Sequence, residues 1–298
     1  MKTRLNRGYY WFLIPGFILF LIFVMLPFVA NIYLSFTRWS GVGIPEFIGL
    51  KNYLRAIDDF NFWLSLKNNV VIIVVLTTIP TIIALFLAVF LFQFVAVKVG
   101  KTTANLFKAG FYLPQIIPVA IIGVIWKWIL QPNWGALNVI LEKIKLGSLA
   151  QNWLGDPGYA LGAVLVVMVW FQIGYPLVIF MSALQRIDPQ IYESARVDGA
   201  KGLRMFLSIT LPLISPEFYV VILTTIIYSL KIFGPIFALT RGGPGNATMV
   251  ASYFSYKNFF EFSNVGYGAT MSTIISLIIM LITVVYIKLQ SFESTEGE

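Results

Sequence analysis

The segment 184–200 combines charged and small residues in a pattern that suits a helical docking surface. Asp188 can accept a hydrogen bond from the first free amides of a helix, and Pro189 fits the first helical position. Gly199 suits the left-handed conformation that ends a helix, so a helix of about ten residues is predicted here. The residues it would offer are Glu193, Ser194, Ala195, Asp198, Gly199 and Ala200. Such a helix could fit a groove on a partner, or it could lie solvated on a membrane.

Several other kinds of chemistry are excluded by composition. The chain has no His and no Cys, which removes disulfides, Cys/His metal sites and catalysis by imidazole or thiol. Gly100-Lys101-Thr102 looks like the end of a phosphate-binding loop, but position 95, where that pattern needs Gly, is Val. We therefore expect no nucleotide site, no metal, no resident cofactor and no catalytic residues in this chain.

A second set of polar residues interrupts otherwise apolar stretches. Gln172 and Tyr175 share one stretch, whereas Thr224 and Tyr228 lie four residues apart in another, and Lys231 continues that face. Ser276 lies in a third stretch. These side chains could hydrogen-bond a polar solute on its way through the protein. Alternatively, their hydroxyls bond their own helix or join one helix to another.

The composition defines the environment in which these residues work. Of the 298 residues, 58% are hydrophobic and 11% are charged, and the mean hydropathy is +0.83. Soluble domains carry about 25% charged residues, so this chain is predicted to be an all-α polytopic membrane protein. In such a protein a net charge of +8 indicates orientation in the bilayer, and no nucleic-acid partner is expected.

Six apolar stretches are long enough to cross the hydrocarbon core as helices. They lie at about 10–34, 69–94, 106–130, 159–183, 211–238 and 266–288. The first follows three basic residues and is too long for a secretion signal, so it is predicted to be an uncleaved span. Seven prolines fall inside the stretches, where neighbouring helices can satisfy the freed carbonyls. They are Pro15, Pro27, Pro80, Pro114, Pro118, Pro176 and Pro235.

The distribution of basic residues predicts that both termini face the cytoplasm. With the N-terminus inside, the cytoplasmic segments carry Lys2, Arg4, Arg7, Lys98, Lys101, Lys108, Arg186, Arg196, Lys201, Arg204 and Lys288. The other side carries Arg38, Lys51, Arg55, Lys67, Lys143, Lys145, Arg241 and Lys257. Because the cytoplasmic segments are shorter, their density of positive charge is about twice as high, as the positive-inside rule requires. Aromatic residues agree: Tyr9, Tyr10 and Trp11 would form an inner belt, and Trp39, Trp126 and Trp128 an outer one.

The loop between the fourth and fifth stretches resembles the EAA loop of binding-protein-dependent ABC importer permeases. The matching positions are Glu193-Ser194-Ala195, Asp198-Gly199-Ala200, Phe206, Ile209, Leu211-Pro212 and Pro216, with Ser194 in place of an Ala. Two further stretches resemble the carbohydrate-type subgroup and its larger subunit: Leu239–Pro244 with Ala247-Thr248, and Phe47–Tyr53 with Asp58, Phe62-Trp63 and Asn68-Asn69.

The resemblance implies a fold and a set of partners. The fold would be the type I ABC importer transmembrane fold, with residues 1–68 as first helix and outer loop, 69–288 as transmembrane domain and 289–298 as cytoplasmic tail. Loop 184–210 would couple the chain to an ATPase through Glu193, Ala195, Asp198, Gly199 and Ala200. The partners would be a second, homologous permease in a heterodimer, two cytoplasmic ABC ATPase subunits and an extracytoplasmic solute-binding protein. The complex would lie in a bacterial or archaeal inner membrane.

The resemblance also implies a function, the import of a sugar or related solute driven by ATP that the partner subunits hydrolyse. Gln172, Tyr175, Thr224, Tyr228 and Ser276 would then line the substrate path, because sugars need hydrogen-bond partners and an aromatic surface. The alternative is an ion-coupled secondary transporter working without an ATPase. That class usually needs carboxylates or His within the membrane, and Glu217 is the only acidic residue near a span interior. A membrane enzyme would need a catalytic constellation, and the sequence shows none.

Overall fold

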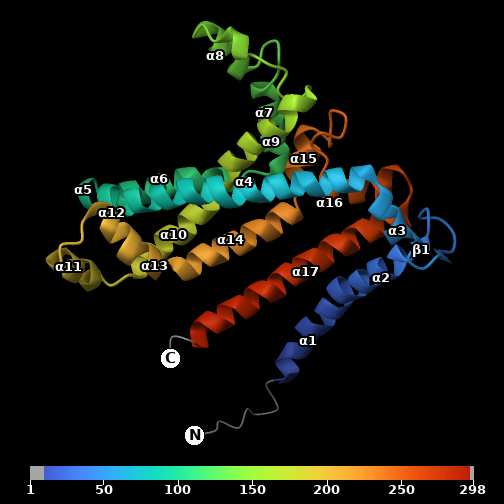
Figure 1. Ribbon diagram of the computed structural model, residues 1–298, viewed down its shortest axis with the longest axis horizontal. Helices are drawn as coiled ribbons and strands as arrows, with labels where there is room; N and C mark the ends of the chain where they lie inside the picture. The colour runs from blue at the N-terminus through green and yellow to red at the C-terminus, as the bar shows by residue number, and fades with distance from the viewer. Residues whose placement is uncertain (1–9, 296–298) are drawn as a thin grey trace. The chain divides into compact units, whose positions relative to one another are not determined.

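The computed structural model describes residues 10–295, and nearly all its elements are helices (Figure 1). The chain divides into two compact units. In the described range, unit 1 comprises residues 10–63 and 254–280, and unit 2 comprises residues 64–253 and 281–295. The predicted basic cluster at Lys2, Arg4 and Arg7, and Tyr9 of the predicted belt, lie outside the described residues.

Unit 1 contains the first span and the beginning of the last one. The first span consists of α1 (Tyr10–Phe20), a π-helical turn (Leu21–Met25) and α2 (Leu26–Ser35). It is followed by β1 (Thr37–Arg38), β2 (Glu46–Phe47), α3 (Lys51–Asp58) and the first turn of α4 (Phe60–Phe90). The chain returns to unit 1 with the end of α16 (Ala251–Tyr256), the π-helical turn Lys257–Glu261 and the first part of α17 (Val265–Thr295). The two strands pair antiparallel, with Thr37 opposite Phe47 and Arg38 opposite Glu46.

A polar cluster joins α2 to α17 within unit 1. The Asn31 side chain donates to the Ala269 carbonyl at 3.3 Å and to Thr273 Oγ1 at 3.0 Å, and it accepts from Ser272 Oγ at 3.1 Å. Among apolar surfaces such bonds hold two helices in one register. These contacts fix α2 against the first turns of α17.

Unit 2 contains most of α4 and the helices that follow it. They are α5 (Ala96–Lys98), α6 (Lys101–Ile116), α7 (Val119–Ile129), α8 (Ala136–Lys143), α9 (Pro157–Gln172), α10 (Gly174–Arg186), α11 (Pro189–Val197), α12 (Gly202–Met205), α13 (Leu211–Leu213), α14 (Ser215–Leu230), α15 (Gly234–Leu239) and the start of α16. Unit 2 also includes the π-helical turns Leu91–Val95 and Phe206–Thr210 and the 3-10 turn Gly147–Leu149.

The six predicted spans each correspond to a helix or to a bent pair of helices. Within residues 10–295, the helices long and apolar enough to cross a membrane are Trp11–Ser35, Phe60–Lys98, Pro157–Arg186 and Val265–Lys288. Two bent pairs bring the number to six when each is counted as one span. The second of these helices starts at Phe60 rather than near 69, because the Asp59 side chain caps it by accepting from the Asn61 amide at 2.8 Å.

The third span is broken, whereas the sequence predicted one helix over 106–130. Its halves, Lys101–Ile116 and Val119–Ile129, meet at an angle of 96°. Ile117 has an extended conformation, with φ −74° and ψ 131°. A residue that precedes proline is disfavoured in the helical region, so Pro118 ends one helix and starts the next. The expectation that the helix would continue through this proline was wrong.

The fifth span also differs from the predicted helix over 211–238. Gly202–Leu213 and Ser215–Leu230 meet at 69°. The helix bends here because Pro216 has no amide hydrogen to donate to the Pro212 carbonyl. That carbonyl accepts a hydrogen bond from Ser215 Oγ at 2.9 Å instead. The helix then ends at Leu230. Lys231 is exposed and lies beyond the helix end, so the polar face that was predicted to continue to Lys231 stops at Tyr228.

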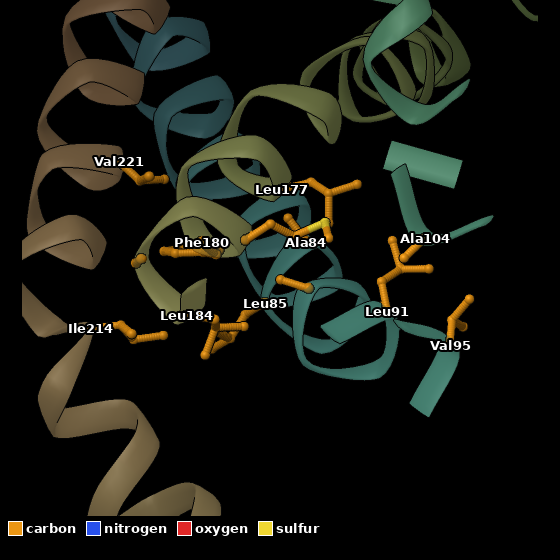
Figure 2. Packing of buried hydrophobic residues seen from close by; sticks show 13 residues of the cluster. Ala84, Leu85, Leu91, Val95, Ala104, Leu177, Phe180, Leu184, Ile214 and Val221 are labelled. Atoms are coloured by element: carbon orange, nitrogen blue, oxygen red, sulfur yellow. The ribbon is translucent and has the colours of Figure 1, made fainter. Parts of the chain in front are cut away.

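A buried apolar cluster joins α4, α6, α10 and α14 in unit 2. Figure 2 shows its side chains converging from these helices. Its members are Ala84, Leu85, Ala88, Leu91, Val95, Ala104, Leu177, Phe180, Met181, Ala183, Leu184, Ile214 and Val221. In a bilayer such packing gains dispersion energy rather than hydrophobic free energy, so close fit decides its strength. The cluster holds together the helix ends from which the loop 184–210 departs.

Candidate functional site

The loop between α10 and α14 contains the helix that the sequence predicted. The Asp188 carboxylate accepts a hydrogen bond from the Gln190 amide at 2.9 Å, and Pro189 is the first residue of α11. The carboxylate thereby satisfies one of the free donors in the first turn. The start of α11 is therefore determined by local sequence.

The end of α11 has the hydrogen bonds of a Schellman motif. The Ala200 amide donates to the Ala195 carbonyl at 2.8 Å, and the Gly199 amide donates to the Arg196 carbonyl at 3.1 Å. Gly199 has a φ of +81°, which is the left-handed conformation that this motif requires. The predicted role of Gly199 as the helix end is confirmed.

Ala195 and Ala200 lie inside the loop. They are 7% and 9% exposed, and they form a small cluster with Met205, against which Tyr192 and Ile209 pack. An apolar contact between these two positions commonly accompanies a Schellman end. The two alanines therefore support the shape of the loop, and their side chains offer little surface to a partner.

The exposed side of the loop carries both charge and apolar surface. Glu193 and Asp198 are exposed. Val197 is 88% exposed and Leu203 is 70% exposed. The sequence did not indicate either residue, because an apolar residue in a loop gives no sign of its orientation. Together they present apolar surface beside carboxylates, a combination suited to a partner with a groove.

The two ends of the loop are joined to each other. Arg186, in the last turn of α10, forms an ion pair with Glu217, in the first turn of α14. Leu184 and Ile214, close to the same two ends, are fully buried in the cluster of Figure 2. The ends of the loop are therefore anchored to both helices.

The structure brings together two of the predicted substrate-path residues. Tyr175 Oη of α10 lies 3.0 Å from Thr224 Oγ1 of α14, and Thr224 also donates to the Val220 carbonyl at 2.7 Å. Gln172 is buried at the end of α9, and Tyr228 is half-buried one turn beyond Thr224. Ser276 lies in unit 1, where its hydroxyl donates to the Ser272 carbonyl at 2.8 Å.

Two hydroxyls that the sequence analysis passed over lie on the neighbouring face of α14. Thr225 and Ser229 are buried, and their side-chain oxygens have no hydrogen-bond partner among the described residues. Buried polar groups are nearly always hydrogen-bonded, so an unpaired one calls for an explanation such as a water or a ligand. In the sequence, Thr225 and Ser229 lie four residues apart and so share one face of the helix. Thr224 and Tyr228 have the same spacing, so the spacing alone could not show which pair is buried.

Gly174 allows α10 to approach α6 very closely. A Cβ atom at this position would lie 2.5 Å from the Phe111 carbonyl oxygen and 2.8 Å from the Tyr112 Cα. Only glycine therefore fits between these two backbones. The contact fixes α10 beside the first half of the broken span, one residue from Tyr175.

Two asparagines of α4 hold the segment that follows α15. Asn68 donates to the carbonyls of Ala247 at 3.1 Å and Met249 at 2.8 Å. Asn69 donates to the Ser229 carbonyl at 2.8 Å and accepts from the Ala251 amide at 2.9 Å. Buried amides that satisfy backbone groups in this way determine the path of an irregular segment.

The apolar helices, the broken spans and the helical loop define a polytopic membrane protein. A family model described as "Binding-protein-dependent transport system inner membrane component" matches residues 71–293. The chain belongs to this family of multi-pass inner-membrane transport proteins.

Relatives of known sequence cover nearly the whole chain. The probable ABC transporter permease protein YurN of Bacillus subtilis is 34% identical over 281 residues, 94% of each chain. The trehalose/maltose transport system permease protein MalF of Thermococcus litoralis is 31% identical over 294 residues, 98% of this chain and 96% of the relative.

The fold is also found in a solved structure. A chain in the crystal structure of a bacterial alginate ABC transporter, in complex with an alginate pentasaccharide-bound periplasmic protein, has a TM-score of 0.78 and 21% identity. The match covers 93% of this chain and 91% of that one. At this identity the likeness concerns the fold.

Proposed function

We propose that the chain is the permease subunit of an ATP-driven importer for a sugar or sugar-like solute. The observation that carries the proposal is the loop 184–210, whose helix is fixed at both ends and joined to two transmembrane helices. A rigid loop can transmit a movement imposed from outside the membrane, which a solvated surface helix would not do. Family membership supports the same conclusion.

The partners follow from this role. Two separate ABC ATPase subunits supply the energy, one of them engaging the exposed side of α11, and a second homologous permease completes the path. An extracytoplasmic binding protein delivers the solute to the outer side. The orientation that this requires, with both termini and the loop in the cytoplasm, is the one that the basic residues predict.

The substrate class is supported by the names of relatives and by the polar residues of unit 2. A relative is named for trehalose and maltose, and Tyr175, Thr224, Thr225, Tyr228 and Ser229 supply hydroxyl and aromatic groups on α10 and α14. Sugars are recognised by such groups when water is excluded. We propose that these residues, with Gln172, face the solute during transport.

The decisive experiment is reconstitution into proteoliposomes. The chain, its partner permease, the ATPase subunits and the binding protein are assembled, and uptake of labelled maltose, trehalose and xylose is measured. We expect uptake only with ATP, and none when the ATPase phosphate-loop lysine is replaced. Uptake by the chain alone, driven by an ion gradient, would instead establish a secondary transporter.

A further inference from the structure

A large groove with basic residues on its lining is formed within unit 2 by residues of α5, α6, α10, α11 and α12. Figure 1 labels α5, α11 and α12 at one end of this unit. The volume of the groove is about 1230 Å³, which is above the range of about 300–1,000 Å³ for small-molecule pockets. Residues of α6, α10 and α11 form its walls, together with the last turns of the second span.

The charge of the groove is strongly one-sided. The basic residues on its lining are Lys101, Lys108, Arg196 and Lys201, and Glu193 is the only acidic residue among the described residues that line it. The ion pairs Arg38–Glu46 and Arg186–Glu217 do not involve these four cations. The groove therefore favours an anion.

The same groove has an apolar wall. Phe94 and Val97, from the end of the second span, are 50% and 77% exposed, and Phe92 and Met181 line the groove beside them. An inorganic anion gains nothing from such a wall. An occupant with both a negative headgroup and a hydrocarbon chain satisfies both parts.

We propose that this groove binds an anionic phospholipid of the cytoplasmic leaflet, with its phosphate among the four cations and an acyl chain along Phe94 and Val97. The proposal rests on the orientation given under the proposed function. Because Glu193 and Arg196 belong to both the groove and α11, a bound lipid would set the position of the coupling helix.

The test counts lipids on the full-length chain in detergent micelles by native mass spectrometry. Dioleoyl-phosphatidylglycerol is titrated against dioleoyl-phosphatidylcholine, which has the same chains and no net charge. We expect one site that prefers phosphatidylglycerol. Lys101→Gln with Lys108→Gln should lower that affinity about 30-fold, which corresponds to about 1 kcal/mol for each cation beside an anionic lipid.

A control removes one charge nearby without changing a residue that lines the groove. Arg204 is exposed and does not line it, so Arg204→Gln should change the affinity by less than about twofold. A circular dichroism spectrum like that of the wild type shows that each variant is folded. Lys201→Gln, in the segment after α11, is a second variant expected to weaken binding about fivefold.

Four results would overturn the proposal. Three of them are equal binding of the two lipids, unchanged affinity in the Lys101/Lys108 variant, and displacement of the lipid by millimolar inorganic phosphate, which would define a site for soluble anions. Loss of the lipid when the ATPase subunits are added would also overturn it, because the groove would then be a protein contact. Lipid occupancy is counted without transport, so this measurement and the uptake assay succeed or fail separately.

Discussion

Replacing Gly199 tests whether the end of α11 determines coupling. The residue has a φ of +81°, and a Cβ atom built there meets nothing within 4 Å. Alanine therefore causes no clash, and its effect is conformational alone. Asparagine tolerates the left-handed region better than alanine does, which makes Gly199→Asn the matched comparison.

The expected size of the effect follows from the backbone. A left-handed conformation costs an L-residue about 1–2 kcal/mol, which corresponds to about a 5- to 30-fold change in the population of the formed loop end. Gly199→Pro is more severe, because proline cannot adopt a positive φ and removes the amide that donates to the Arg196 carbonyl at 3.1 Å.

Two measurements on the reconstituted importer check this reasoning. Hydrogen exchange at the Ala200 amide, which bonds the Ala195 carbonyl, should accelerate about 5- to 30-fold in Gly199→Ala and less in Gly199→Asn. Uptake should decrease from the Asn variant to the Ala variant and be lowest in the Pro variant, while membrane insertion stays normal. Wild-type uptake in Gly199→Pro would refute a coupling role for this loop.

Three further predictions concern the loop, the helix contacts and the path. Glu193→Lys should lower ATP-driven uptake at least about tenfold, because it reverses a charge on a docking surface. Glu193→Gln should lower uptake less, and the Tm of both variants should equal that of the wild type. Gly174→Ala should lower the Tm by the equivalent of about 1–3 kcal/mol through overpacking, whereas Gly162→Ala, which has open space around its Cβ, should not. Thr225→Val and Ser229→Ala should each reduce uptake about 2- to 12-fold if their hydroxyls bond the solute; a raised Tm with normal uptake would show that they are only unpaired polar groups.

The class of protein and the local shape of the loop could be predicted from the sequence. Long apolar stretches can only be helices in a bilayer, because each backbone group must be satisfied within its own segment. The limits of α11 were equally predictable, since Asp188, Pro189 and Gly199 act on their immediate neighbours.

Tertiary structure decided which side chains meet and which are hidden. The contact of Tyr175 with Thr224 and the bonds from Asn68 to the segment after α15 join residues far apart in the chain, so no local pattern reports them. Pro80 lies inside a helix and Pro118 between two helices, so a proline in an apolar stretch did not by itself show where a helix breaks. The burial of Ala195 depended on packing: its spacing allowed either orientation, and only the contact with Met205 turned it inward.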